Sequence, residues 1–149
     1  MLVGTLALWP SVALAQNAQP WTLSSVAENG SIATLTRGSQ APDSGWTFTA
    51  DGKTIRVVGQ WKYSADCDAP SAIAHEVWAD TVTVVIITGF PRRPGVDCWT
   101  TWSQSPYEVR ISGLELFTYH VIVRLVDIEA LWRPLRTGKP VATGKVAFP

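Results

Sequence analysis

An Asp-Gly pair between two alternating runs constrains the fold of this chain more than any other feature. Residues 46–61 read WTFTADGKTIRVVGQW. An Asp-Gly pair in this context is the strongest short-range signal for a β-hairpin. If Asp51 and Gly52 form a two-residue turn, the large apolar residues of both runs share one face. The expected cross-strand pairs are Ala50 with Lys53, Phe48 with Ile55, and Trp46 with Val57.

Further segments have strand-like patterns, and one has helical spacing. Residues 80–90 are apolar on both faces, which indicates a central strand, whereas residues 106–114 and 118–126 alternate and residues 140–148 close the chain as a last strand. A weaker hairpin signal lies at Asn29-Gly30. Only residues 127–135 have helical spacing, and Pro134 ends that helix early. The pattern predicts an all-β protein, an antiparallel sandwich of about seven or eight strands with at most one short helix near 127–133.

The N-terminal residues have the features of an export signal. Residues 1–15 are an apolar run that ends in the small-x-small pattern Ala13-Leu14-Ala15, although no Lys or Arg precedes the run. The run is shorter than the roughly 20 apolar residues of a membrane span. We expect cleavage after Ala15 and a secreted or periplasmic protein without a membrane span; a buried N-terminal helix is the alternative. The expected organisation is a signal peptide (1–15), an N-terminal arm or edge hairpin (16–45) and a β-sandwich domain (46–149).

The two cysteines, Cys67 and Cys98, are predicted to form a disulfide. Export would place them in an oxidising compartment, where such a pair usually bonds. Closing the loop between them would stabilise the fold by about 3.7 kcal/mol in the chain-entropy model. A metal site is disfavoured, because no histidines lie nearby at ligand spacing.

The balance of charge along the chain disfavours polyanionic partners. The chain has 12 basic and 12 acidic residues, and charged residues make up only 16% of it. No basic footprint for nucleic acid or for an anionic membrane surface is present.

Residues 107–125, YEVRISGLELFTYHVIVRL, resemble the penultimate strand pair of fibronectin type III and immunoglobulin-like domains. Gly113, Leu114 and Tyr119 match the positions of the Gly-Leu corner and of the tyrosine that opens the next strand. The resemblance implies a structural corner in which the Tyr119 ring lies in the core and its hydroxyl bonds to backbone upstream. Leu116-Phe117 replaces the usual Pro-Gly of the corner, and no Cys-Trp-Cys spacing is present. No function is carried over, because such sandwiches have many unrelated roles.

Motifs for catalysis are missing from the sequence. The only histidines are His75 and His120, and His75-Glu76 lacks the second histidine of the zinc-protease motif. No Gly-x-Ser-x-Gly elbow, phosphate loop or dinucleotide fingerprint occurs, so no cofactor is expected. Four acidic residues are candidates for a glycosidase pair but are also typical of solvated loops: Asp66, Asp68, Glu76 and Asp80. We therefore expect a non-enzyme without a metal site; a metal-assisted hydrolase is an alternative.

The candidate binding residues lie in loops. Residues 89–97, GFPRRPGVD, form a Pro-restricted turn whose arginines either contact a carboxylate or sulfate or only keep the loop solvated. Trp99 and Trp102 are three apart, so a regular strand points them to opposite faces and leaves one outside the core. The candidate binding residues are Arg92, Arg93, Trp99, Trp102 and Trp132. The predicted function is a secreted, non-catalytic binding or structural module that uses the end loops 89–97 and 127–140 to contact a protein or glycan. The alternatives are a carbohydrate-binding module with an exposed Trp and a protease inhibitor presenting the 89–97 loop.

Overall fold

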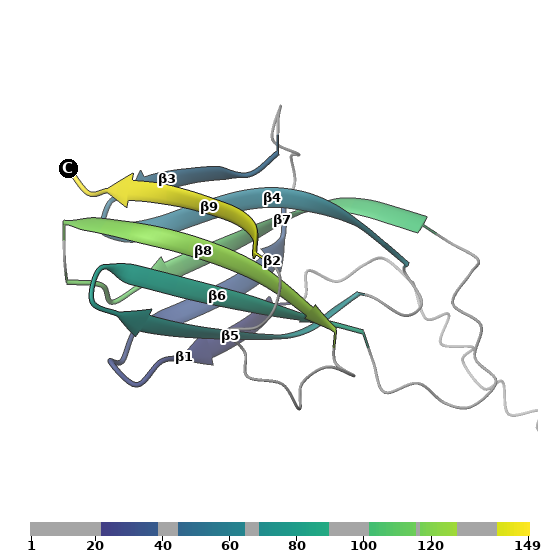
Figure 1. The fold of residues 1–149 in the computed structure, drawn as a ribbon, viewed down its shortest axis with the longest axis horizontal. Helices are drawn as coiled ribbons and strands as arrows, with labels where there is room; N and C mark the ends of the chain where they lie inside the picture. Colours follow the sequence, from purple (N-terminus) through teal and green to yellow (C-terminus); the bar gives the residue numbers. More distant parts are fainter. Residues whose placement is uncertain (1–21, 39–44, 65–68, 90–101, 116, 128–139) are drawn as a thin grey trace, which may run out of the picture.

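Nine β-strands in two packed sheets make up the part of the chain that the computed structural model describes, which is residues 22–38, 45–64, 69–89, 102–115, 117–127 and 140–149. The five-stranded sheet has the order β1 (Thr22–Val26), β2 (Ile32–Arg37), β7 (Trp102–Ser112), β4 (Thr54–Ser64) and β3 (Thr47–Asp51). The four-stranded sheet has the order β5 (Pro70–Trp78), β6 (Thr81–Thr88), β8 (Thr118–Asp127) and β9 (Pro140–Ala147), and Figure 1 shows the two layers. The predicted all-β sandwich is confirmed. The helix predicted near 127–133 lies outside the described residues, except for Asp127, which ends β8.

The β3–β4 hairpin forms, but its predicted register is wrong by two residues. Asp51 pairs with Thr54, so the turn consists of Gly52 and Lys53. Gly52 has a φ of 59°, and positive φ at the first central position alone is the type II′ arrangement, which favours glycine there. A shift of two residues keeps every side chain on its predicted face, because strands have a period of two. The correction places Trp46 over Gly59, where an added Cβ would lie 2.1 Å from the indole.

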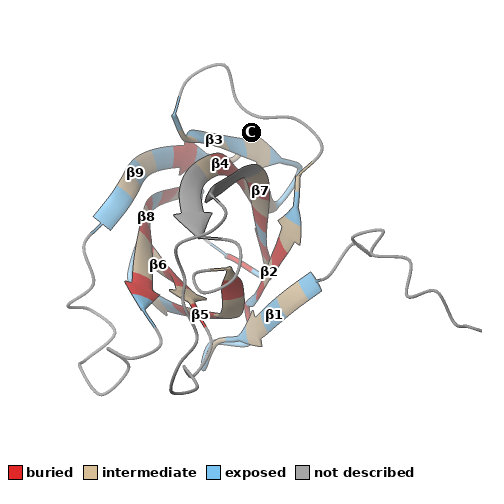
Figure 2. Cartoon of the chain, turned by 90° about the vertical axis from the view of Figure 1, so that its right-hand side faces the viewer, coloured by how far each residue is buried: buried red, intermediate tan, exposed pale blue. Residues whose placement is uncertain are grey.

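The core lies between the inner faces of the two sheets, where buried positions follow the alternation expected from the sequence. On β7, Tyr107, Val109 and Ile111 are fully buried, while the intervening Glu108 and Arg110 face outward. In Figure 2 the buried positions, in red, lie along strands of both sheets. The cluster of buried core residues contains Ala33, Leu35, Ile55, Val57, Ile73, Val82, Val84, Ile86, Tyr107, Val109, Ile111, Leu114, Tyr119, Val121, Val123 and Val146.

β6 is an interior strand of its sheet, as its composition predicts, and it is buried on both faces near its middle, but one of its neighbours runs parallel to it. Val84 is fully buried, and Val85, on the opposite face, is only 2% exposed. β6 pairs antiparallel with β5 and parallel with β8, which differs from the purely antiparallel expectation. The reason is the connection: after β6 the chain forms β7 in the other sheet before it returns as β8. This return restores the direction of β6.

The β5 strand was not predicted from the sequence. Its segment, PSAIAHEVW, contains Ala, His and Glu, which are not typical strand formers. In the structure Ile73 and Val77 face the core together with His75, a polar residue at an inward position that interrupts the apolar alternation. Glu76 and Trp78 consequently lie on the outer face.

The N-terminal hairpin contributes to the core, and the sandwich closes at both edges. β1 pairs with β2 at the edge of the five-stranded sheet, and Ala33 and Leu35 of β2 are fully buried. β1 approaches β5 of the other sheet, and β3 approaches β9. In Figure 2 the strands therefore form an almost closed ring.

Candidate functional site

The loop residues predicted to bind a partner lie outside the part of the chain that the structure describes. Arg92, Arg93, Trp99 and Trp132 are among them, as are Cys67 and Cys98. Trp102 begins β7 with its backbone paired to Ser64. Thr88 is the last residue of β6 and Asp127 is the last residue of β8, and these two residues are paired with each other. The two predicted contact loops thus leave the sandwich from adjacent strand ends, and their binding role and the disulfide stay predictions.

The corner before β8 has the geometry that the fibronectin-like resemblance implies. Tyr119 is 2% exposed, and its hydroxyl oxygen accepts a hydrogen bond of 3.1 Å from the backbone N–H of Glu115. Its ring also packs edge to face against Phe148, with 6.1 Å between the centroids. Gly113 has a φ of 78°, and a Cβ atom added at this position would lie 3.2 Å from the Cα atom of Ser31. These contacts fix the corner and give it a structural role.

An exposed tryptophan lies on the outer face of the four-stranded sheet, beside the β5–β6 turn. Trp78 is 66% exposed, although a Trp side chain usually buries much of its large apolar surface. It pairs with Thr81 across the turn, and the next outward pair is Glu76 with Thr83. Strand alternation alone gives this result, because Trp78 lies on the face opposite to Ile73 and Val77. Once β5 is recognised as a strand, the sequence therefore identifies Trp78 as outward.

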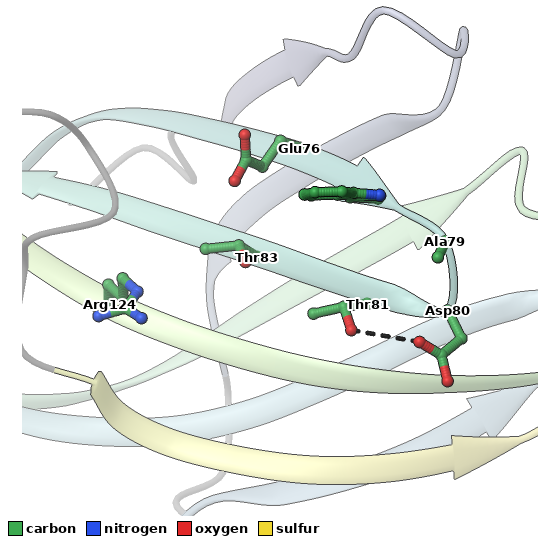
Figure 3. A pocket seen from close by; sticks show the side chains of 7 residues that line it. Glu76, Ala79, Asp80, Thr81, Thr83 and Arg124 are labelled. Atoms are coloured by element: carbon green, nitrogen blue, oxygen red, sulfur yellow. Dashed lines mark hydrogen bonds between the residues drawn. The ribbon is translucent and has the colours of Figure 1, made fainter.

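A hollow of about 370 Å³ opens beside Trp78, and we call it the outer hollow. It is lined by Glu76 and Trp78 of β5, Ala79 and Asp80 of the turn, Thr81 and Thr83 of β6, and Arg124 of β8. Figure 3 shows the carboxylates of Glu76 and Asp80 and the guanidinium of Arg124 around the two threonines. The outer hollow thus combines hydrogen-bond donors and acceptors with an apolar ring.

The turn that carries this hollow is strained and firmly attached. Ala79 has a φ of 52°, the only positive value for a non-glycine residue in the described ranges, and such outliers concentrate at functional sites. The backbone N–H of His120 donates a 2.8 Å hydrogen bond to the carbonyl of Asp80. The Asp80 carboxylate also accepts a 3.4 Å bond from the Thr81 hydroxyl (Figure 3) and lies 3.9 Å from His120 Nε2. The turn, and with it Trp78, is held against β8.

A second hollow, of about 380 Å³, lies on the other side of Trp78 at the edge of the sandwich. This edge hollow is lined by Val26 at the end of β1, residues 27–29 of the β1–β2 loop and residues 75–78 of β5. Glu76 and Trp78 line both hollows. Trp78 therefore separates two concave surfaces, one on the sheet face and one at the sheet edge.

His75 connects the two sheets beneath the edge hollow. Its Nδ1 lies 2.6 Å from the Ser25 hydroxyl, and its Nε2 lies 2.9 Å from the hydroxyl of the fully buried Ser31. The side-chain oxygen of Asn29, Oδ1, accepts hydrogen bonds from both the hydroxyl and the backbone N–H of Ser31. The Ser31 oxygen then accepts from Nε2–H, so Nδ1 accepts from Ser25. Burial is the main influence on the imidazole and lowers the pKa of His75, although a hydrogen bond with the backbone of Ser31 opposes this.

This chain of hydrogen bonds was not found from the sequence, because Ser25 and Ser31 lie 50 and 44 residues away from His75. It places a hydroxyl beside a histidine, as nucleophilic catalysis requires. However, Ser25 does not line either hollow, and the far end of the chain is the neutral amide of Asn29. The arrangement ties β1 and β2 to β5.

Neither a metal centre nor a membrane-spanning helix is present in the described part of the molecule. Its His, Asp and Glu side chains form no group of three or more with a geometry that would hold a metal ion. Within the same ranges, no helical segment has the length and hydropathy needed to cross a bilayer. No protein-family model, curated protein or solved structure matches the chain.

Proposed function

We propose that this protein is an exported, non-catalytic binding module that recognises a carbohydrate at Trp78. The observation that carries the proposal is the 66% exposure of a tryptophan bordered by carboxylates, hydroxyls and a guanidinium. The binding-module class agrees with the prediction from the sequence. The position of the site differs from the predicted end loops, and it favours the carbohydrate alternative.

The chemistry of the outer hollow suits a sugar ring. A pyranose presents an apolar face of C–H groups and a rim of hydroxyls, so it needs a flat apolar platform together with donors and acceptors. Trp78 provides the platform, Glu76 and Asp80 accept hydrogen bonds, Arg124 donates them, and Thr83 does both. A site with a few polar groups around an aromatic surface is typical of small-molecule recognition.

The remaining features of the proposal concern the scaffold. Export after cleavage at Ala15 would expose the module to extracellular glycans, and a Cys67–Cys98 disulfide would stabilise it there. We further propose that the likeness to fibronectin type III and immunoglobulin-like domains consists of the sandwich and its tyrosine corner, and excludes their full connectivity. The parallel β6–β8 pair supports this limit, because the immunoglobulin fold is built of antiparallel sheets.

The proposal is tested by titrating a panel of neutral and charged oligosaccharides into the full chain and measuring binding by isothermal titration calorimetry. We expect Trp78→Ala to reduce affinity for any ligand that binds by a factor of at least about 30, as expected for a central aromatic contact worth about 2 kcal/mol. Phe117→Ala is the matched control, because Phe117 is also an exposed aromatic (79%) but lies outside both hollows.

Absence of binding across the panel, or equal affinity of the Trp78→Ala variant, would contradict the proposal. A protease-inhibitor function would instead be indicated if the wild-type chain inhibits a trypsin-like protease and Arg92→Ala with Arg93→Ala abolishes the inhibition. The loop 89–97 that carries these arginines lies outside the described residues.

A further inference from the structure

The two hollows beside Trp78 form one surface. Glu76 and Trp78 belong to both, so a ligand that covers the indole contacts the outer hollow on one side and the edge hollow on the other. Each hollow alone, at about 370 or 380 Å³, is near the small end of the range for ligand sites. A chain of linked units fits this surface better than a single ring, because successive units reach both hollows.

Among the described residues that line this surface, negative charges outnumber positive ones. Glu28 lines the edge hollow, Asp80 lines the outer hollow, and Glu76 lines both, whereas Arg124 contributes a positive charge to the outer hollow. His75 also lines the edge hollow, but burial lowers its pKa and favours the neutral imidazole. An anionic ligand is therefore disfavoured in the edge hollow.

The exposed indole adds a second reason for a positively charged ligand. Cations are attracted to the face of an aromatic ring, and Trp gives the strongest interaction of this kind. A ligand ammonium group beside Trp78 also meets the carboxylate of Glu76 on the same strand, two residues away. The aromatic ring and the carboxylates thus favour the same charge.

We propose that the ligand is an oligosaccharide bearing amino groups, which lies across Trp78 with sugar units in both hollows. This inference rests on the proposed carbohydrate function and specifies its ligand class. Neutral and anionic glycans, and a lysine-bearing peptide, are the other possible occupants that the test must separate.

The test compares glucosamine oligomers, the same oligomers after N-acetylation, and uronic acid oligomers of equal length, each titrated into the full chain by calorimetry. With the amines protonated, we expect the glucosamine oligomers to bind at least about fourfold more tightly than the acetylated ones, since two or three carboxylates each contribute about twofold to fivefold. The uronic acid oligomers should bind most weakly. A single glucosamine should bind far more weakly than a tetramer, because it reaches one hollow only.

Two charge-neutralising variants examine the edge hollow directly. We expect Glu28→Gln and Glu76→Gln each to weaken glucosamine oligomers about twofold to fivefold more than they weaken the acetylated oligomers. Glu115→Gln is the matched control, since Glu115 is an exposed carboxylate outside both hollows. The difference between glucosamine and acetylated oligomers should also shrink at high salt.

Several results would overturn the inference while leaving the proposed function intact. One such result is that the acetylated or uronic acid oligomers bind as tightly as the glucosamine oligomers, or more tightly, while Trp78→Ala still reduces binding. Another is that a single sugar binds as tightly as a tetramer. If no glycan binds but a lysine-bearing peptide does, in a manner that depends on Trp78, both the inference and the carbohydrate function are wrong.

Discussion

At the β3–β9 edge of the sandwich the two sheets meet through an aromatic ring on a glycine, whereas at the β1–β5 edge they meet through a histidine between two serines. The ring of Phe48 lies so close to Gly144 that an added Cβ would be 2.3 Å from it. At the other edge the imidazole of His75 spans Ser25 and Ser31. The first closure depends on volume, and the second depends on hydrogen-bond partners and on a neutral imidazole.

This difference indicates why the candidate site lies where it does. At the aromatic closure the Phe48 ring of β3 packs directly on Gly144 of β9, and close packing stabilises it. The hydrogen-bonded closure keeps polar groups near the surface, and His75 and Asn29 also line the edge hollow. One edge of the sandwich is therefore suited to stability, and the other can contribute polar groups to a ligand.

The largest effect is expected from adding one methyl group at the aromatic edge. Gly144→Ala should lower the free energy of unfolding by about 2–3 kcal/mol, because the new Cβ overlaps the Phe48 ring and forces it to move. Urea denaturation measures the change. In a Phe48→Leu background the same substitution should cost less, since the overlapping ring is gone.

Gly38→Ala is the matched control for that experiment, because a Cβ at Gly38 would lie 3.4 Å from Pro106, an ordinary contact. It should change stability by less than about 1 kcal/mol. Equal stability of Gly144→Ala and wild type would show that the aromatic ring does not close this edge.

At the polar edge, removal of one hydroxyl should have the next largest effect. Ser31→Ala should lower the free energy of unfolding by about 2 kcal/mol, because it leaves the buried His75 Nε2 without its partner and removes one of the two hydrogen bonds to the Asn29 side-chain oxygen. Ser24→Ala on the exposed outer face should stay within about 0.5 kcal/mol of wild type. If both serine variants unfold at the same urea concentration, the sheets are not tied together by this hydrogen bond.

The sequence predicts those parts of the molecule in which one local pattern decides the structure. β6, β7, β8 and the β3–β4 hairpin follow from alternation and turn chemistry, and the faces of Phe48 and Ile55 were correct even though their register was not. The register was wrong because the turn could be placed on either side of Gly52 without changing which residues face the core. Only the fit of Trp46 over Gly59, a tertiary contact, separates the two arrangements.

The candidate site was less accessible to prediction, because it depends on contacts between distant segments. β5 was missed because a polar residue, His75, occupies a core-facing position. The hydrogen-bond partners of its ring nitrogens are Ser25 of β1 and Ser31 of the β1–β2 loop, which are distant in the sequence. Without β5, the outward direction of Trp78 could not be assigned. The hollows form where β5, the β1–β2 loop and β8 meet, and this arrangement includes the parallel β6–β8 pair that no local pattern indicates.

Acidification should weaken the polar edge and leave the aromatic edge unaffected. Because burial lowers the pKa of His75 in the folded state, the unfolded chain takes up this proton first as the pH falls below the ordinary histidine value. The contribution of His75 to stability is thus fully present above that value and is lost as the pH falls through the folded pKa. Urea midpoints at pH about 7.5 and about 5 measure the loss, since histidine titrates in this interval.

A His75→Gln variant should lose less stability than wild type between these pH values, because glutamine does not titrate. The Gly144→Ala variant should retain the wild-type pH dependence, because its change is at the opposite edge. If the His75→Gln variant loses as much stability as wild type, the imidazole between the serines is not the titrating group.

The smallest effect is expected on the outer face of the five-stranded sheet, where ion pairs are exposed to solvent. Arg110 pairs at 2.9 Å with Asp51, whose side chain is 59% exposed. Asp51→Asn should lower the free energy of unfolding by about 0.5 kcal/mol, because solvent and side-chain entropy offset most of the attraction, and salt should reduce the difference further. Asp51 ends β3, the strand that carries Phe48, so this variant also tests whether the aromatic edge depends on charge. A loss as large as that of Gly144→Ala would mean that the ion pair positions β3, and closure by volume alone would then be the wrong description of that edge.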